Sequence, residues 1–62
     1  MLKEKAGVIA GEIWNTLNEN GALDIKAIKK FTKETEKDLY LGLGWLLRED
    51  KISSEDNVFN LK

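Results

Sequence analysis

The sequence predicts a mainly α-helical domain that ends in a small β-hairpin. Apolar residues recur at the period of an α-helix from residue 2 to about residue 49. Polar capping residues divide this region into three helices. Residues 51–61 instead have short strand-like segments on both sides of a polar turn, which is the pattern of a β-hairpin. The 62 residues are therefore expected to form one domain.

The first predicted helix covers residues 2–19. Its core face is a single apolar stripe at helical spacing, formed by Leu2, Ala6, Ile9, Ala10, Ile13 and Leu17. Gly21 follows a polar run and can adopt the positive φ that often ends a helix. We therefore expect this helix to end before Gly21.

A second stripe on the same helix has an unusual composition. It consists of small or uncharged residues, namely Gly7, Gly11, Trp14 and Asn18, with Val8 beside them. Each glycine inside a helix costs ~1 kcal/mol relative to alanine, so close packing against this face is expected. Two interpretations are open. Either the hairpin or a later helix covers the face, or the face belongs to a subunit interface.

A short amphipathic helix is predicted for residues 25–32. The segment Gly21-Ala22-Leu23 forms an extended link before it, which could pair as one short strand, and Asp24 is a good N-cap residue. The expected inner face consists of Ile25, Ile28 and Phe31. The outer face is basic throughout, with Lys26, Lys29, Lys30 and Lys33.

The third predicted helix covers residues 36–49. Thr35 is its expected N-cap, and Asp38 three residues later completes an approximate capping box. Its expected core face consists of leucines at helical spacing, namely Leu39, Leu43, Leu46 and Leu47. The strength of this spacing makes the third helix the element around which the other two should pack.

The last predicted element is a β-hairpin over residues 51–61. Its turn is the polar segment Glu55-Asp56-Asn57, and strand-like residues flank the turn on both sides. Because side chains alternate along a strand, Phe59 and Leu61 lie on one face of the hairpin. We assign that face to the core.

The order of these elements resembles a winged helix-turn-helix domain, with three helices, a C-terminal wing and one optional short strand after the first helix. Ile28 matches the core position of the second helix, Thr35 matches the cap, and Ile52 matches the residue that opens the wing. The core of the recognition helix is matched by Leu39, Leu43 and Leu46. The usual Gly-Leu-Ile segment before the wing is replaced by Asp50-Lys51-Ile52, and Asp tolerates the required left-handed conformation better than most residues. The whole is similar to a small family of stand-alone bacterial winged-helix proteins of unknown function.

The charge pattern departs from that of a DNA-binding domain. The net charge is −1, whereas DNA affinity comes largely from cations that neutralise phosphates. The N-terminus of the recognition-like helix has Glu34, Glu36 and Asp38, which would face phosphates, and the wing has no Lys or Arg from residue 53 to residue 60. DNA binding is therefore the alternative interpretation. Its candidate phosphate contacts are Lys26, Lys29, Lys30, Lys33 and Lys37.

The favoured interpretation is a non-catalytic protein-interaction module. More apolar surface is present than one small core can bury, and exposed aromatic residues often mark interfaces. The candidate interface consists of Gly7, Val8, Gly11, Trp14, Leu41 and Trp45. A homodimer is the expected assembly, and another protein partner is also open. In a competing explanation, Trp45 packs under the wing against Phe59.

Several other functions are not expected. The chain has no His and no Cys, so the usual nucleophile pairs and transition-metal ligands are missing. No cofactor, metal or small-molecule substrate is expected, and neither is enzyme activity. No apolar run reaches the roughly 18 residues of a membrane span, so we expect no membrane association and a cytoplasmic location.

Overall fold

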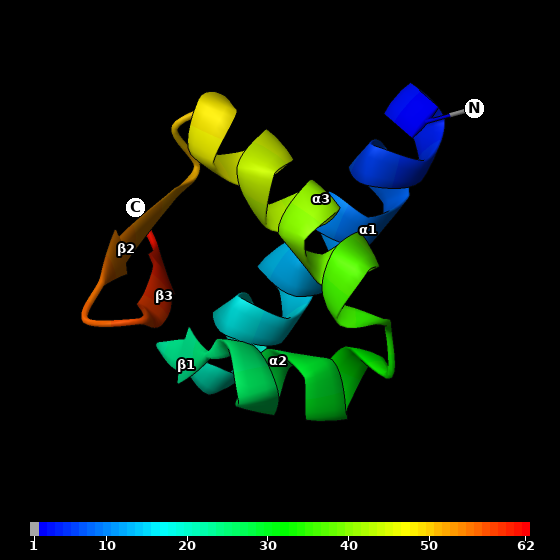
Figure 1. The fold of residues 1–62 in the computed structure, drawn as a ribbon. Coiled ribbons are helices and arrows are strands. Elements are labelled where there is room, and N and C mark those ends of the chain that lie inside the picture. The colour runs from blue at the N-terminus through cyan, green and yellow to red at the C-terminus, as the bar shows by residue number, and fades with distance from the viewer. Residues whose placement is uncertain (1) are drawn as a thin grey trace.

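A computed structural model describes residues 2–62 of the chain, with side chains described from Glu4 onward. The elements follow the predicted order (Figure 1). They are α1 (Leu2–Asn20), β1 (Leu23–Asp24), α2 (Ile25–Thr32), α3 (Glu36–Arg48), β2 (Ile52–Glu55) and β3 (Val58–Leu61). The optional strand after the first helix is thus present. The side chain of Leu2, a predicted core residue, lies outside the described part of the chain.

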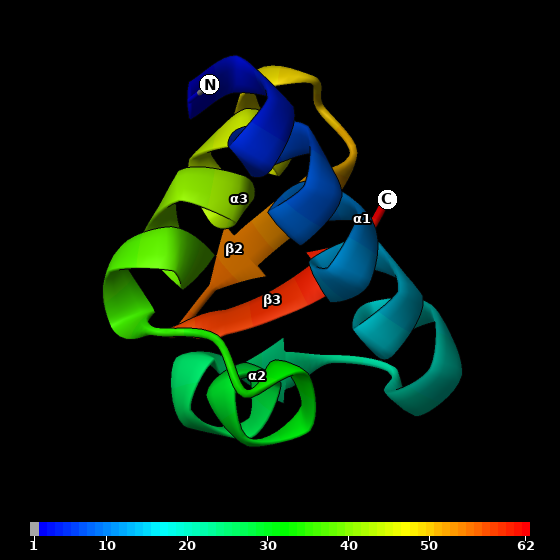
Figure 2. The ribbon, with the colours of Figure 1, turned by 90° about the vertical axis from the view of Figure 1, so that its right-hand side faces the viewer.

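The two longest helices cross, and the other elements are arranged around this crossing. In Figure 1, α3 passes in front of α1, α2 lies below both helices, and the sheet lies to one side. Figure 2 shows the same arrangement from the side, with α1 and α3 next to each other above α2. Among the described residues, no helix combines the length and apolar character that crossing a membrane requires.

The core lies between the three helices and the sheet. It consists of Ile9, Ala10, Ile13, Leu17, Ile28, Leu39, Leu43, Leu46 and Ile52. Partly buried side chains pack against its border, namely Leu23, Ile25, Trp45, Phe59 and Leu61. The prediction that Phe59 and Leu61 face the core is therefore confirmed. This apolar cluster is the main source of folding free energy in the domain.

Two predicted core residues are largely exposed. Phe31 is 56% exposed and Leu47 is 44% exposed, so their assignment to the inner faces is wrong. The half-buried Thr32 takes the inner position one turn after Ile28, which turns Phe31 to the flank of α2. In α3 the buried residues are Leu39, Gly42, Leu43 and Leu46, so the buried face includes Gly42 and leaves Leu47 on the solvent side.

Local caps and turns fix the ends of the elements. The Ala27 N–H donates to Asp24 Oδ1 over 2.8 Å, and the Asp38 N–H donates to Thr35 Oγ1 over 3.2 Å, so both predicted N-caps are confirmed. Gly21 has the expected positive φ of 81° at the end of α1. Asp50, which replaces the usual glycine before the wing, has a φ of 57° between α3 and β2, so the predicted left-handed conformation is confirmed.

The sheet has three antiparallel strands in the order β1-β3-β2. In the wing, Ile52 pairs with Leu61 and Glu55 pairs with Val58. The turn is therefore shorter than predicted, because Glu55 belongs to β2. Its two residues, Asp56 and Asn57, both have positive φ, which matches the twist of a two-residue hairpin.

Gly42 allows α1 and α3 to approach each other closely. A Cβ atom at this position would lie 2.7 Å from Ile9 Cγ2, 2.9 Å from Ile13 Cδ1 and 3.1 Å from the Ala10 backbone nitrogen. Gly44, two residues later, has no such neighbour within 4 Å. The two glycines therefore differ in packing although they share one helix.

This difference predicts opposite effects of the same substitution. Gly42→Ala should lower the free energy of unfolding, because overpacking costs about 1–3 kcal/mol and exceeds the gain in helix propensity of about 1 kcal/mol. Gly44→Ala, the matched control, should gain about 1 kcal/mol. Thermal unfolding should separate the two variants by about 10 °C. Equal stability of the two variants would show that the helices can move apart at little cost.

Candidate interaction groove and helix-turn-helix surface

An open groove lies between α1 and the C-terminal half of α3. It has a volume of ≈ 330 Å³. Its lining consists of Gly7, Ala10, Gly11, Trp14, Trp45, Leu46, Glu49 and Lys51. Both tryptophans of the chain therefore line the same groove. The lining is mainly apolar, with one acidic and one basic residue.

The α1 side of the groove is open because its glycines have no covering side chain. A Cβ atom at Gly7 or Gly11 would meet nothing within 4 Å. The interpretation that the wing or a later helix covers these glycines is therefore wrong. Each glycine costs ~1 kcal/mol of helix stability relative to alanine, and no contact within the described chain requires it.

The two tryptophans differ in their surroundings. Trp14 is 38% exposed, whereas Trp45 is half-buried and packs against the core cluster. The sequence left two placements of Trp45 open, in an interface or packed under the wing against Phe59. The structure has Trp45 packed against the core cluster and also lining the groove. Because the core holds the Trp45 side chain in place, this side of the groove has a defined shape.

The structure brings together part of the predicted interface. Gly7, Gly11, Trp14 and Trp45 share the groove. Val8 is 64% exposed but does not line it, and the half-buried Leu41 does not line it either. Sequence reasoning missed Glu49 and Lys51, because their place in the groove depends on the turn at Asp50.

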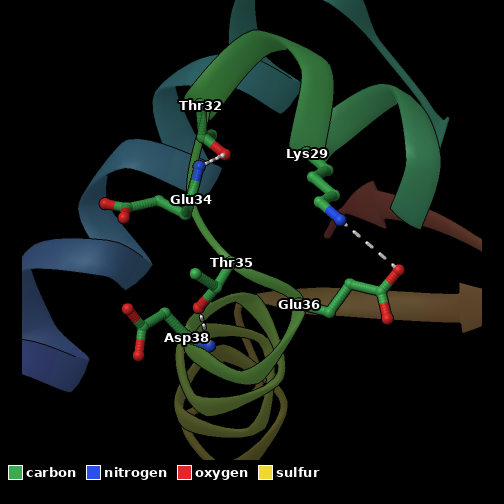
Figure 3. Close-up of polar contacts among 6 residues, drawn as sticks. All are labelled: Lys29, Thr32, Glu34, Thr35, Glu36 and Asp38. Carbon is green, nitrogen blue, oxygen red and sulfur yellow. Dashed lines mark hydrogen bonds and ion pairs between the residues drawn. The ribbon is translucent and has the colours of Figure 1, made fainter.

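The acidic residues at the start of α3 point in different directions (Figure 3). Asp38 faces α1, where its Oδ1 lies 3.2 Å from Lys5 Nζ, and its side chain is 18% exposed. Glu36 points the other way, and its Oε1 lies 3.7 Å from Lys29 Nζ. Glu34 also points toward α1 in Figure 3. The expectation that all three carboxylates face outward is therefore wrong, and only Glu36 does.

Most of the candidate phosphate contacts are exposed and have no carboxylate partner. Within residues 2–62, Lys29 is the single member of the five that forms an ion pair. The others are exposed on α2, in the turn after it and in the first turn of α3, namely Lys26, Lys30, Lys33 and Lys37. The left-handed conformation of Lys33, with a φ of 60°, ends α2 and turns the chain toward α3.

This helix-turn-helix geometry agrees with a comparison against protein families. Residues 1–60 match the family model described as "Winged helix-turn-helix domain (DUF2582)". The chain belongs to this winged helix-turn-helix family. Comparison with curated proteins gives no significant match. In the winged helix-turn-helix domain described above, α2 and α3 form the helix-turn-helix, and β2 and β3 form the wing.

A carboxyl pair connects α1 with the turn of the winged helix-turn-helix domain. Glu12 of α1 lies beside Glu34, within reach of a hydrogen bond. Partial burial raises the pKa of Glu12 above its ordinary value of 4.5, and the hydrogen bond and the negative charge of Glu34 raise it further. Glu12 therefore holds its proton more tightly in the folded state than in the unfolded chain.

This carboxyl pair predicts a pH dependence of stability. A folded-state pKa that is raised stabilises the fold at low pH, and this stabilisation is lost as pH rises through the folded-state pKa. At pH 7 the Glu12→Gln variant should therefore be more stable than the wild type, because its amide can donate to the Glu34 carboxylate. Below the ordinary Glu pKa of 4.5 the difference should disappear. Urea unfolding of both proteins at pH 7 and at a pH below 4.5 measures this difference in the free energy of unfolding.

The matched control for this experiment is Glu19→Gln, an exposed carboxyl two turns further along α1. It should leave the wild-type pH profile unchanged. A Glu12→Gln variant with the wild-type stability at every pH would contradict the role of this pair.

Proposed function

We propose that this winged helix-turn-helix domain is a non-catalytic module that binds protein through the groove between α1 and α3. The observation on which this depends is that both tryptophans line one groove together with two uncovered glycines. Aromatic residues are enriched in protein interfaces, and charged residues are depleted from the interface centre. The groove has this composition.

The chemistry of the remaining surface supports a binding role over catalysis. The chain contains no His or Cys that could act as a nucleophile or a proton shuttle. Among residues 2–62, no cluster of three or more His, Cys, Asp or Glu side chains could hold a metal ion. Function in such a fold is determined by its surface sites, and the groove is one such site.

A charge placed in the groove should abolish partner binding. Tagged wild type, Trp14→Glu and Leu47→Glu are used to capture proteins from the native cell extract, followed by quantitative mass spectrometry. At least one protein should be retained by the wild type and lost with Trp14→Glu, because a truncated interface tryptophan commonly costs about 2 kcal/mol or more, or roughly 30-fold in affinity.

Leu47→Glu is the matched control in this capture experiment. Leu47 is an exposed apolar residue of α3 outside the groove, so its substitution introduces the same charge without contact to the lining. The control should retain the same partner as the wild type. Identical retention by all three folded variants, with folding checked by circular dichroism, would refute the groove as the binding site.

A second candidate function is phosphate-driven DNA binding by the helix-turn-helix. The observation that favours it is the inward direction of Glu34 and Asp38, which removes two carboxylates from the outer side of α3. The exposed lysines of α2 and its turn could then contact phosphates, as the first helix of a docked helix-turn-helix does. Lys37 and Arg48 of α3, which form no ion pair with the side chains described from Glu4 onward, would add to this charge.

This function predicts salt-dependent binding that involves particular lysines. Fluorescence anisotropy of a random labelled duplex at ~50 mM salt should show binding, with loss of affinity as salt rises. Lys30→Ala should reduce the slope of log K against log salt by about 0.9, the value for one phosphate contact. Lys62→Ala, which removes a lysine paired with Asp50 instead, is the control. No binding at ~50 mM salt, or equal effects of the two substitutions, would exclude this mode.

A further inference from the structure

The exposed face of α1 beside the groove has no charged residue over three turns. The exposed positions of this face are Gly7, Val8, Gly11, Trp14, Asn15 and Asn18. Charged residues make up 34% of the chain, so an uncharged face of this length is a marked departure from the rest of the surface. A continuous uncharged face of about 17 Å suits the length of one partner helix.

Two charged residues of α1, Lys5 and Glu12, lie on its other side, whereas the exposed Glu4 lies one turn before Gly7 and Val8. Lys5 pairs with Asp38 of α3, and Glu12 lies beside Glu34 of the turn after α2. Both are therefore directed toward the helix-turn-helix. Between Gly7 and Asn18 the groove side of α1 therefore has no charged residue, which disfavours a nucleic acid or a strongly charged peptide as its occupant.

The two charged residues of the groove balance each other. Glu49 and Lys51 lie on its α3 side and have opposite charge. An interface between two identical copies has the same surface on both sides, so its charges must be complementary to themselves. One acid and one base meet this condition, because a twofold axis can place the acid of each copy near the base of the other.

The sizes of the α1 residues are also complementary to one another. Gly7 and Gly11 leave open space on the helix, and Trp14 adds a large ring one turn beyond Gly11. A twofold axis perpendicular to α1 makes two facing copies of this helix run antiparallel. If the axis passes near Gly11, each Trp14 is directed back toward the glycine surface of the other copy.

We propose that the occupant of the groove is a second copy of this chain, with α1 packed antiparallel on α1 of the partner and each Trp14 over the partner's glycine surface. This proposal depends on the proposed function of the groove in protein binding. A standard interface buries about 800 Å² on each partner, which is roughly a fifth of the 4390 Å² of accessible surface of this chain. A domain this small, without disulfides, also gains the support that oligomerisation gives to a limited core.

The first experiment compares two glycine variants by sedimentation velocity from about 1 µM to about 1 mM, a range that covers weak and moderate dimers. Gly11→Glu and Gly44→Glu each replace an exposed helix glycine that has open space around it, so both variants should fold. The wild type and Gly44→Glu should form dimers with similar Kd values. Gly11→Glu should raise the dimer Kd at least 100-fold, because it places two like charges near the axis.

Intrinsic fluorescence gives a second measure in the same samples. Both tryptophans line the groove, so tryptophan emission, excited at a wavelength that Tyr40 does not absorb, reports on this region. Dimer formation should shift the emission of the wild type and of Gly44→Glu to shorter wavelength, with the same midpoint as sedimentation. Gly11→Glu should keep the emission of the monomer over this range.

Cross-linking tests the position of the axis. The chain has no Cys, so one introduced thiol has no competitor within the chain. Under mild oxidation, Gly11→Cys should form a disulfide-linked dimer, whereas Gly44→Cys should stay a monomer on a denaturing gel. The reverse result would place the interface on the outer face of α3 and overturn the proposal.

Failure of this proposal can be distinguished from failure of the proposed function. A wild type that stays monomeric over the whole range overturns the dimer. So does a dimer with the same Kd in Gly11→Glu and the wild type. If Trp14→Glu still loses a different captured protein in the extract experiment, the groove keeps its role in protein binding.

Discussion

The close approach of α1 and α3 at Gly42 is the contact on which the other features depend. A glycine at this position lets the backbone of α1 come near α3, with Ala10 N only 3.1 Å from where a Cβ would lie. The crossing closes the core on one side of α1. It also places Trp45 beside Gly7 and Gly11, so the groove results from the same contact. Core packing and the candidate site are therefore not independent parts of the molecule.

Much of the fold could be predicted because its signals are local. Asp24 and Thr35 cap the helices through bonds to residues three positions later, so the helix bounds follow from the sequence to within one residue. The errors concern side-chain direction. Phe31 and Leu47 lie at the edge of the buried face of their helices. Whether a residue at such an edge is buried or exposed depends on the packing of neighbouring elements.

The candidate site could be predicted only in part, because it combines residues from distant positions. The composition of the second α1 stripe identified the glycines and Trp14 as candidate interface residues. These residues share a groove with Trp45 only because α1 and α3 cross. Lys51 lies in the same groove because the chain makes a left-handed turn at Asp50. The direction of Glu34 likewise depends on the turn that follows the left-handed Lys33, which periodicity does not reveal.

The double role of Trp45, in the core and in the groove, has a consequence for the domain in the cell. Its side chain packs against the core and also lines the groove, so the proposed binding surface is complete only in the folded chain. A partner that binds the folded form alone raises folding stability by mass action, by RT ln(1 + [L]/Kd). For a domain of 62 residues with a small core, the amount of partner would then control the fraction of chains exposed to proteolysis. Occupancy of the groove would thus be linked to the abundance of the protein.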